Sequence, residues 1–185
     1  VQPEGDRDFG GGVQTFQRLW AELDVPVIAK ETGNGISREV AGRLRSLGIR
    51  HADTSGAGGT SWVGVETLRA EGDGRALGET LWDWGVPTAA SVHYCVEAGL
   101  TTIATGGIRH GMDVARAIAL GASCAGIARN VYQALLEGGA EGARDFLLRV
   151  ERELRSIMLL CGAKSIEELQ QAPRIVTGEL RDWIA

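Results

Sequence analysis

Residues 101–129 read TTIATGGIRHGMDVARAIALGASCAGIAR, and the order of residue types in this stretch decides the fold class. Thr101–Thr105 and Cys124–Ala128 are short apolar runs bounded by turn residues, a pattern typical of buried parallel strands. Between them, Met112–Leu120 predicts a helix that Gly121 ends. The stretch therefore predicts one strand–helix–strand unit of a parallel sheet.

The same alternation extends toward the N-terminus. Val25–Lys30 and Ile49–Thr54 predict two further strands, of which the second is the less apolar. Helices are predicted at Ser37–Leu47, which starts with a capping serine, and at Pro87–Ala98, which Gly99 ends. Four such units make either half of a (β/α)₈ barrel or a small open doubly wound sheet.

Two observations favour the barrel. Candidate ligand residues follow several different strands, as barrel active sites require, and the first dozen residues read as a loop-to-helix connection. The remainder, 141–185, predicts an amphipathic helix at Ala143–Leu160, a short helix near Ser165–Gln170, and a tail. We therefore predict an α/β fold of the TIM (β/α)₈ type, here about its C-terminal half, with residues 1–185 forming a single partial domain.

Composition excludes some partners. The chain has 185 residues, 44% of them hydrophobic, and a formal charge of −5, which does not suit nucleic acid or an anionic membrane. No apolar stretch reaches the length of a membrane span, and the N-terminus does not resemble a signal peptide. Three scattered cysteines lack metal or disulfide spacing, and Cys124 and Cys161 read as core fillers. These features predict a cytoplasmic protein with reduced thiols.

The strongest local signal for chemistry is the run Thr105–Arg109 (TGGIR), followed by Ala128 and Arg129 at the end of the next strand. In barrels, the loops after the last two strands commonly bind a phosphate with backbone N–H groups at a helix N-terminus. Gly106 and Gly107 let the backbone approach an anion, and Arg109 or Arg129 adds charge-assisted hydrogen bonds. The simpler reading is a glycine turn with two surface arginines.

Two other strand ends carry candidate ligand residues. Residues 55–62 (SGAGGTSW) follow the second predicted strand, where hydroxyls and glycines could hold a phosphate or a ring edge; the alternative is a flexible loop. Lys30 ends the first predicted strand and could stabilise negative charge on a ligand, although a solvated lysine is equally consistent with this position.

Other reactive residues carry little signal. Of the three histidines, only His110 is placed near a candidate ligand, and a solvated residue at a helix start is the favoured reading. Glu4, Asp6 and Asp8 could bind a metal, but an acidic surface loop explains them better. No metalloprotease, nucleophile-elbow or P-loop motif occurs.

Five segments together resemble type 2 isopentenyl diphosphate isomerase, in the order PEGDRDFGG, PVIAKETGNGISREVAGRL, DTSGAGGTSW, ATGGIRHGMDVARAIALGA and TGELRDW. The resemblance covers nearly the whole chain and is poorest at 65–81. It implies an enzyme of isoprenoid biosynthesis that interconverts isopentenyl and dimethylallyl diphosphate, with reduced FMN as acid–base cofactor, Mg²⁺, and NADPH as electron source. It also implies that Lys30, Ser55 and Thr60 contact the flavin, and that Gly107, Ile108, Arg109, Ala128 and Arg129 hold its phosphate.

The chain also departs from the family. A His-x-Asn-x-Leu-Gln-Glu run, which supplies the family's substrate-site His, catalytic Gln and Mg²⁺-binding Glu, lies before the position of Val1. The resemblance therefore assigns this chain no catalytic residue and no metal ligand. We expect a fragment of a longer enzyme that is inactive alone, and the family implies a homo-oligomer, a tetramer or larger.

Three alternatives remain at this point. An oxidase of 2-hydroxy acids needs a catalytic His followed by Gly and Arg near the seventh barrel strand, and a relative of IMP dehydrogenase needs a loop cysteine. No histidine or cysteine here has that setting. The third is a half-barrel that only binds flavin or phosphate, or that assembles with itself to cover its sheet edges.

Overall fold

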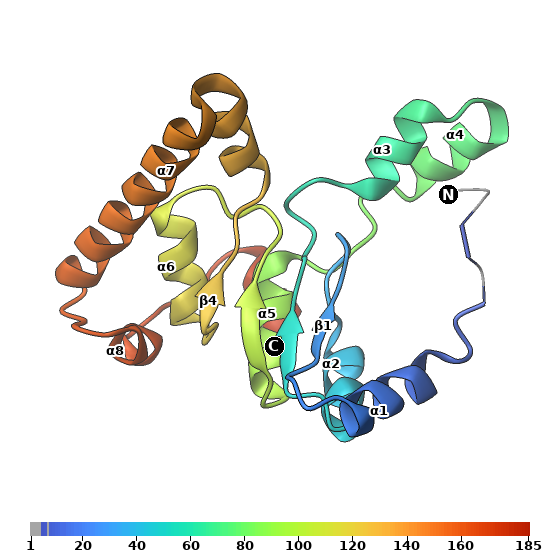
Figure 1. Cartoon of the computed structure of the whole chain (residues 1–185), viewed down its shortest axis with the longest axis horizontal. Helices are drawn as coiled ribbons and strands as arrows, with labels where there is room; N and C mark the ends of the chain where they lie inside the picture. The colour runs from blue at the N-terminus through green and yellow to red at the C-terminus, as the bar shows by residue number, and fades with distance from the viewer. Residues whose placement is uncertain (1–4, 7) are drawn as a thin grey trace.

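The computed structural model describes residues 5, 6 and 8–185, and a parallel sheet of four strands forms its centre (Figure 1). The strands lie side by side in chain order and are β1 (Ile28–Lys30), β2 (His51–Asp53), β3 (Thr101–Ala104) and β4 (Cys124–Ala125). Every neighbouring pair is parallel. The carboxyl ends of all four strands therefore meet at one edge of the sheet, where α/β folds bind their ligands.

Each of the four predicted strands contains one observed strand, so these predictions are confirmed, although the observed strands are shorter. Hydrogen bonds continue past the strand ends, from Thr54 N–H to Ile103 O at 3.1 Å and from Gly56 N–H to Thr105 O at 3.0 Å. Just after β2, Ser55 adopts a φ of 37° and turns the chain.

The three helices predicted between the strands are confirmed as α2 (Arg38–Ser46), α5 (Thr88–Glu97) and α6 (Gly111–Ala119). Ser37 caps α2 as expected, because its side chain accepts a hydrogen bond from Val40 N–H at 3.3 Å. Pro87 is the N-cap of α5 and not its first helical residue, since its ψ of 142° is extended. The short C-terminal helix is confirmed as α8 (Ile166–Gln171).

Four of the described helices have no residue range predicted from the sequence, although the first dozen residues indicate a connection that leads into a helix. They are α1 (Gly12–Glu22), α3 (Trp62–Arg69), α4 (Gly72–Thr80) and α9 (Glu179–Ile184). The predicted helix at Ala143–Leu160 is part of the longer α7 (Arg129–Leu160). Gly138 and Gly139 have non-helical backbone angles, so α7 consists of two arms joined at a kink, which Figure 1 shows at the top of the orange helix.

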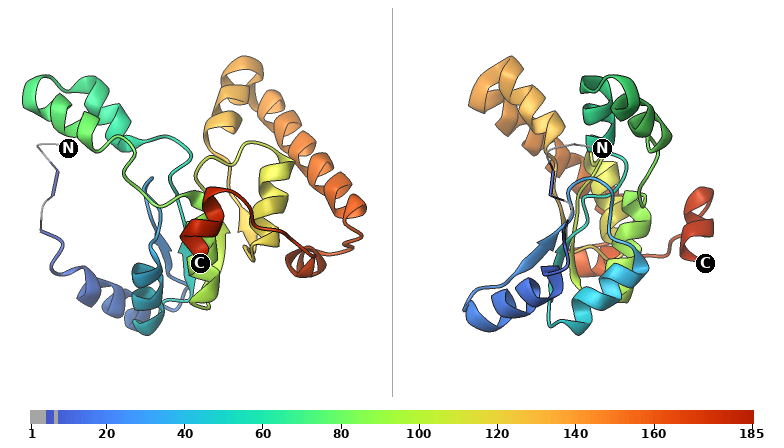
Figure 2. Two further views of the ribbon diagram at one scale, coloured as in Figure 1. Left: turned by 180° about the vertical axis from the view of Figure 1, so that it is seen from behind. Right: turned by 90° about the vertical axis from the view of Figure 1, so that its right-hand side faces the viewer.

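The remaining helices extend the structure beyond the sheet. Figure 1 shows α3 and α4 as a helical pair that stands away from the sheet, and the two helices pack against each other. At the other end of the chain, α9 returns to pack against α5 (Figure 2). The Tyr94 hydroxyl of α5 donates a hydrogen bond to the Trp183 carbonyl of α9.

Buried side chains form two clusters. One lies around β3, α6 and the second arm of α7 and includes Ile118 and Phe146, and the other lies around β1, β2, α2 and α5 and includes Ile49 and Cys95. The expectation that Cys124 and Cys161 fill the core is wrong, because both are exposed. Cys124 lies on β4, at one end of the described sheet, and Cys161 caps the C-terminus of α7.

We expect iodoacetamide to alkylate Cys124 and Cys161 well before Cys95 in the folded chain. Burial raises the pKa of the Cys95 thiol to about 12, and only the thiolate is reactive. Peptide mass spectrometry after brief labelling measures the order, and labelling in concentrated urea is the control in which all three react. Early modification of Cys95 in the folded chain would contradict its burial.

Candidate functional site

A cavity of about 810 Å³ lies at the carboxyl ends of the strands. Its walls come from the four segments that follow β1, β2, β3 and β4. The residues predicted from the sequence to contact a ligand all line it, namely Lys30, Ser55, Thr60, Gly107, Ile108, Arg109, Ala128 and Arg129. The structure therefore brings together residues that lie as much as a hundred positions apart in the chain.

The cavity wall is cationic. Lys30, Arg109 and Arg129 line it, whereas no Asp or Glu is among the described residues that do so. The net charge of the whole chain is −5, so this local excess of positive charge reflects the placement of individual side chains. Such a wall attracts an anionic ligand.

Lys30 is held by a carboxylate that the sequence reasoning did not single out. Its Nζ lies 2.8 Å from Asp53 Oδ2, and the parallel register of β1 and β2 pairs these two residues directly. The other carboxylate oxygen of Asp53 accepts a hydrogen bond from the Thr105 hydroxyl. The Thr105 hydroxyl oxygen in turn accepts a hydrogen bond from Ser55 N–H at 2.9 Å.

The loop after β1 is organised by Glu31. One carboxylate oxygen accepts hydrogen bonds from the backbone N–H groups of Gly33, Asn34 and Gly35, at 2.5, 2.6 and 3.0 Å. Three donors around one carboxylate fix the loop that carries Gly33 along the cavity. Glu31 therefore has a structural role here, and its negative charge is compensated locally.

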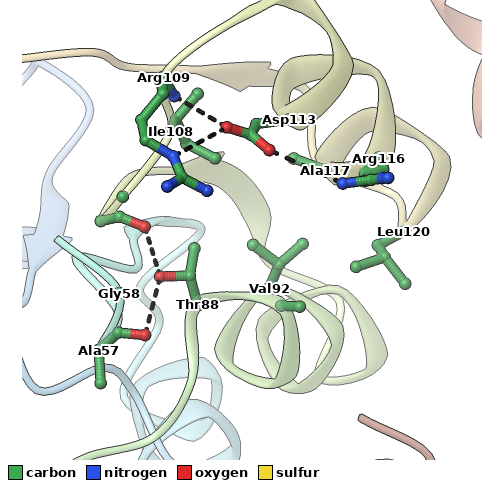
Figure 3. Close-up of a pocket in the computed structure, with 13 residues that line it drawn as sticks. Ala57, Gly58, Thr88, Val92, Ile108, Arg109, Asp113, Arg116, Ala117 and Leu120 are labelled. Carbon is green, nitrogen blue, oxygen red and sulfur yellow. Dashed lines mark hydrogen bonds and ion pairs between the residues drawn. The ribbon is translucent and has the colours of Figure 1, made fainter. Parts of the chain in front are cut away.

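The glycine-rich loops after β2 and β3 press against each other. A Cβ added to Gly106 would lie 2.2 Å from the Gly56 carbonyl oxygen, and one added to Gly107 would lie 2.2 Å from the Gly58 carbonyl oxygen. Figure 3 shows the Thr88 hydroxyl between the loops, and it donates to the Gly106 carbonyl at 2.6 Å. These glycines are required for loop-to-loop contact, a reason that the sequence analysis did not anticipate.

Asp113 orders the loop that carries Arg109 (Figure 3). Its Oδ2 accepts a hydrogen bond from Arg109 N–H at 3.1 Å and lies 3.5 Å from Arg109 Nε. The backbone N–H of Arg109 is therefore occupied. Among the described residues, the N–H groups of Gly107 and Ile108 have no hydrogen-bond acceptor, so these two donors can bind an anion.

The start of α7 adds donors from the segment that follows β4, the neighbour of β3 in the sheet. Ala128 is its N-cap and provides no side-chain hydrogen bond to the first turn. The first N–H groups of a helix lack partners within the helix and carry partial positive charge. Arg129, Asn130 and Gln133 of this first arm also line the cavity.

The other residues considered from the sequence lie elsewhere. None of the three histidines or three cysteines lines the cavity. His110 caps α6, where its Nδ1 accepts a hydrogen bond from Asp113 N–H at 3.3 Å. Glu4 lies outside the described residues, whereas Asp8 accepts a hydrogen bond from Gly10 N–H within its own loop.

Within residues 5, 6 and 8–185, no group of three His, Cys, Asp or Glu side chains is placed to hold a metal ion. No helix in the same part of the chain combines the length and the apolarity needed to cross a membrane.

Residues 15–176 match the family described as FMN-dependent dehydrogenase, and the chain belongs to this family. Solved structures of mandelate oxidase are similar in fold. The complex with (S)-4-hydroxymandelic acid has a TM-score of 0.65 and 26% sequence identity over 87% of this chain and 40% of that one. These matches confirm the predicted fold class, a (β/α)₈ barrel of which this chain forms four strand–helix units.

Curated relatives named isopentenyl-diphosphate delta-isomerase match the whole chain. The Thermococcus onnurineus protein is 46% identical over 188 residues, and the Methanosarcina barkeri protein is 47% identical over 190 residues. The matches cover 100% of this chain and 50% and 51% of those proteins. The chain thus spans about half the length of the curated relatives it matches.

We expect Gly106→Ala to destabilise the fold. Gly106 has a φ of +99°, so alanine there costs about 1–3 kcal/mol in backbone strain, before the clash with Gly56 is counted. Gly42→Ala is the matched control, because Gly42 lies inside α2 with no atom within 4 Å of an added Cβ.

Helix propensity predicts that Gly42→Ala raises the free energy of unfolding by about 0.5–1 kcal/mol. Urea unfolding of both variants measures the difference. Equal effects of the two substitutions would disprove the tight contact between the glycine loops.

Proposed function

We propose that this chain forms the cofactor-binding part of an FMN-dependent isomerase that interconverts isopentenyl and dimethylallyl diphosphate. One observation carries the proposal: residues from four strand ends surround a single cationic cavity, and they include the residues to which the family resemblance assigns flavin binding. The name of the curated relatives and the family of the chain support the same reading.

The residues present fit FMN. The cavity volume of about 810 Å³ lies within the usual range of ligand pockets, about 300–1,000 Å³. We assign the FMN phosphate to the N–H groups of Gly107 and Ile108 and to the start of α7, with Arg109 and Arg129 adding charge. Lys30, Ser55 and Thr60, which line the cavity at the ends of β1 and β2, would then contact the ring system.

Reduced FMN would supply the acid–base group for moving a proton on the substrate. The contribution of this chain is to bind and orient the cofactor. Lys30, held by Asp53, places a fixed positive charge at the cavity wall, where it stabilises negative charge at low reorganisation cost. The close contact between the two glycine loops holds the backbone around the binding position.

The rest of the activity requires groups outside this chain. We propose that a substrate-site His, a catalytic Gln and a Mg²⁺-binding Glu come from the part of the relatives that this chain does not match. NADPH would reduce the flavin, and the substrate would be a small diphosphate. We further propose a cytoplasmic homo-oligomer, a tetramer or larger, which binds neither nucleic acid nor membrane.

The similarity to mandelate oxidase structures favours a second candidate, an oxidase of 2-hydroxy acids. Such an oxidase needs a catalytic histidine close to the flavin. His51, His93 and His110 all lie outside the cavity lining, which argues against this candidate. Isomerisation is therefore the better supported activity.

We expect Arg129→Met to lower the affinity for FMN by about tenfold to a hundredfold, the loss that follows from removing one charge-assisted hydrogen bond. Affinity for riboflavin, which lacks the phosphate, should not change. Flavin fluorescence titration measures both. Arg75→Met is the control, because Arg75 pairs with Glu79 on α4, away from the cavity. Equal losses for FMN and riboflavin would refute the phosphate assignment.

The reaction is tested with a chimera in which this chain replaces the matching half of the Thermococcus onnurineus protein. Under anaerobic conditions with FMN, NADPH and Mg²⁺, we expect dimethylallyl diphosphate to form from isopentenyl diphosphate. Omitting NADPH should abolish the product. A folded, FMN-loaded chimera that does not isomerise the diphosphate, but that oxidises (S)-mandelate in air without NADPH and with O₂ as the electron acceptor, would replace the isomerase proposal with the oxidase.

A further inference from the structure

Asp53 lies just behind the cavity wall. Its side chain is 13% exposed and it does not line the cavity, yet both of its carboxylate oxygens are engaged by residues that do. Lys30 Nζ lies 2.8 Å from one oxygen, and the Thr105 hydroxyl donates to the other. A single buried carboxylate thus links the ends of β1, β2 and β3.

The hydrogen bond between Asp53 and Thr105 extends this network to Ser55, whose backbone is strained. Ser55 has a φ of 37°, and it is the one non-glycine residue with positive φ in the described part of the chain. Such backbone persists only where its surroundings hold it. The Thr105 hydroxyl, itself bound to Asp53, accepts the N–H of Ser55 at 2.9 Å.

A contribution to stability alone does not account for this arrangement. The Lys30 side chain is 58% exposed, so its ion pair with Asp53 is screened by solvent and contributes little to folding. A mostly buried carboxylate is costly unless its hydrogen bonds are satisfied, and an apolar residue would fill the same strand position more cheaply. What the carboxylate supplies is a defined position for the two groups attached to it.

We infer that Asp53 is a positioning residue, which fixes the Lys30 ammonium at the cavity wall and, through Thr105, fixes the Ser55 turn. The inference rests on the proposed binding of FMN. It adds that the electrostatic effect of Lys30 on the flavin depends on Asp53, a residue that does not line the cavity.

Asp53→Asn distinguishes a positioning role from a simple charge effect, because the two predict opposite signs. If Asp53 acted only through its charge, removing it would make the cavity more positive, favour the anionic reduced flavin and raise the flavin reduction potential. If Asp53 positions Lys30, the ammonium loses its fixed place, and the potential falls toward that of Lys30→Met.

The experiment uses the FMN-loaded holoenzyme as wild type, Asp53→Asn, Lys30→Met and the double variant. Anaerobic equilibration with reference dyes measures the reduction potential, and fluorescence titration measures FMN affinity. We expect Asp53→Asn to lower the reduction potential and to weaken FMN binding by about tenfold. This is the loss expected when Lys30 no longer makes its charge-assisted hydrogen bond to the flavin. In the Lys30→Met background, Asp53→Asn should have almost no further effect on the potential.

Two further variants complete the design. Asp53→Glu keeps the charge but displaces the carboxylate, so positioning predicts a lowered potential and a charge effect predicts none. Asp53→Glu therefore still distinguishes a positioning role from a charge effect if Asp53→Asn fails to fold. Glu79→Gln removes an exposed carboxylate paired with Arg75 on α4 and should leave both measurements unchanged.

An unchanged or raised potential in Asp53→Asn, or additive effects of the Asp53 and Lys30 substitutions, would overturn the inference. Wild-type protein that folds but binds no FMN would instead overturn the proposed function. The two failures are therefore distinguishable.

Discussion

The contact between the glycine loops after β2 and β3 sets the shape of the cavity. Gly106 and Gly107 lie so close to the carbonyl oxygens of Gly56 and Gly58 that no side chain fits between the loops. The two loops therefore form one wall, and Thr88 fastens it from the side of α5 through the Gly106 carbonyl. The positions of Ser55 and Arg109 relative to each other follow from this contact.

Charged side chains near the cavity also determine how its wall is built. Three carboxylates lie near the cavity and each is already committed: Glu31 to backbone N–H groups, Asp53 to Lys30 and Thr105, and Asp113 to the loop of Arg109. None of the three faces the cavity as a lining residue. The cavity wall is therefore cationic although the chain is acidic, because these three carboxylates bind other groups of the protein and do not line the cavity.

Much of this arrangement could be predicted from sequence. Short apolar runs that end at Lys30, Thr54 and Thr105 indicated the strands, and parallel topology then required the residues after them to meet at one edge. Gly107 and Arg129 could be proposed as ligand contacts because they follow the apolar runs that end at Thr105 and Ala128.

The residues that hold the cavity wall from behind, such as Asp53, could not be identified from the sequence, because their roles depend on contacts between distant segments. Asp53 and Thr105 are 52 positions apart, and only the register of the sheet brings them together. One signal was present in the sequence: β2 is the least apolar strand, and a carboxylate in a buried strand indicates a polar network. Helix α4 was missed because its three glycines weaken any helical pattern.

The chain order of the sheet also has a kinetic consequence. Lys30 of β1 and Asp53 of β2 are 23 positions apart, whereas Ser55 and Thr105, which join β2 to β3, are separated by 50, because α3, α4 and α5 intervene. Closing the longer loop costs more chain entropy, so we expect the pairing of β2 with β3 to form more slowly than that of β1 with β2. The glycine loops belong to that pairing, and we therefore expect the cavity to take shape late in folding.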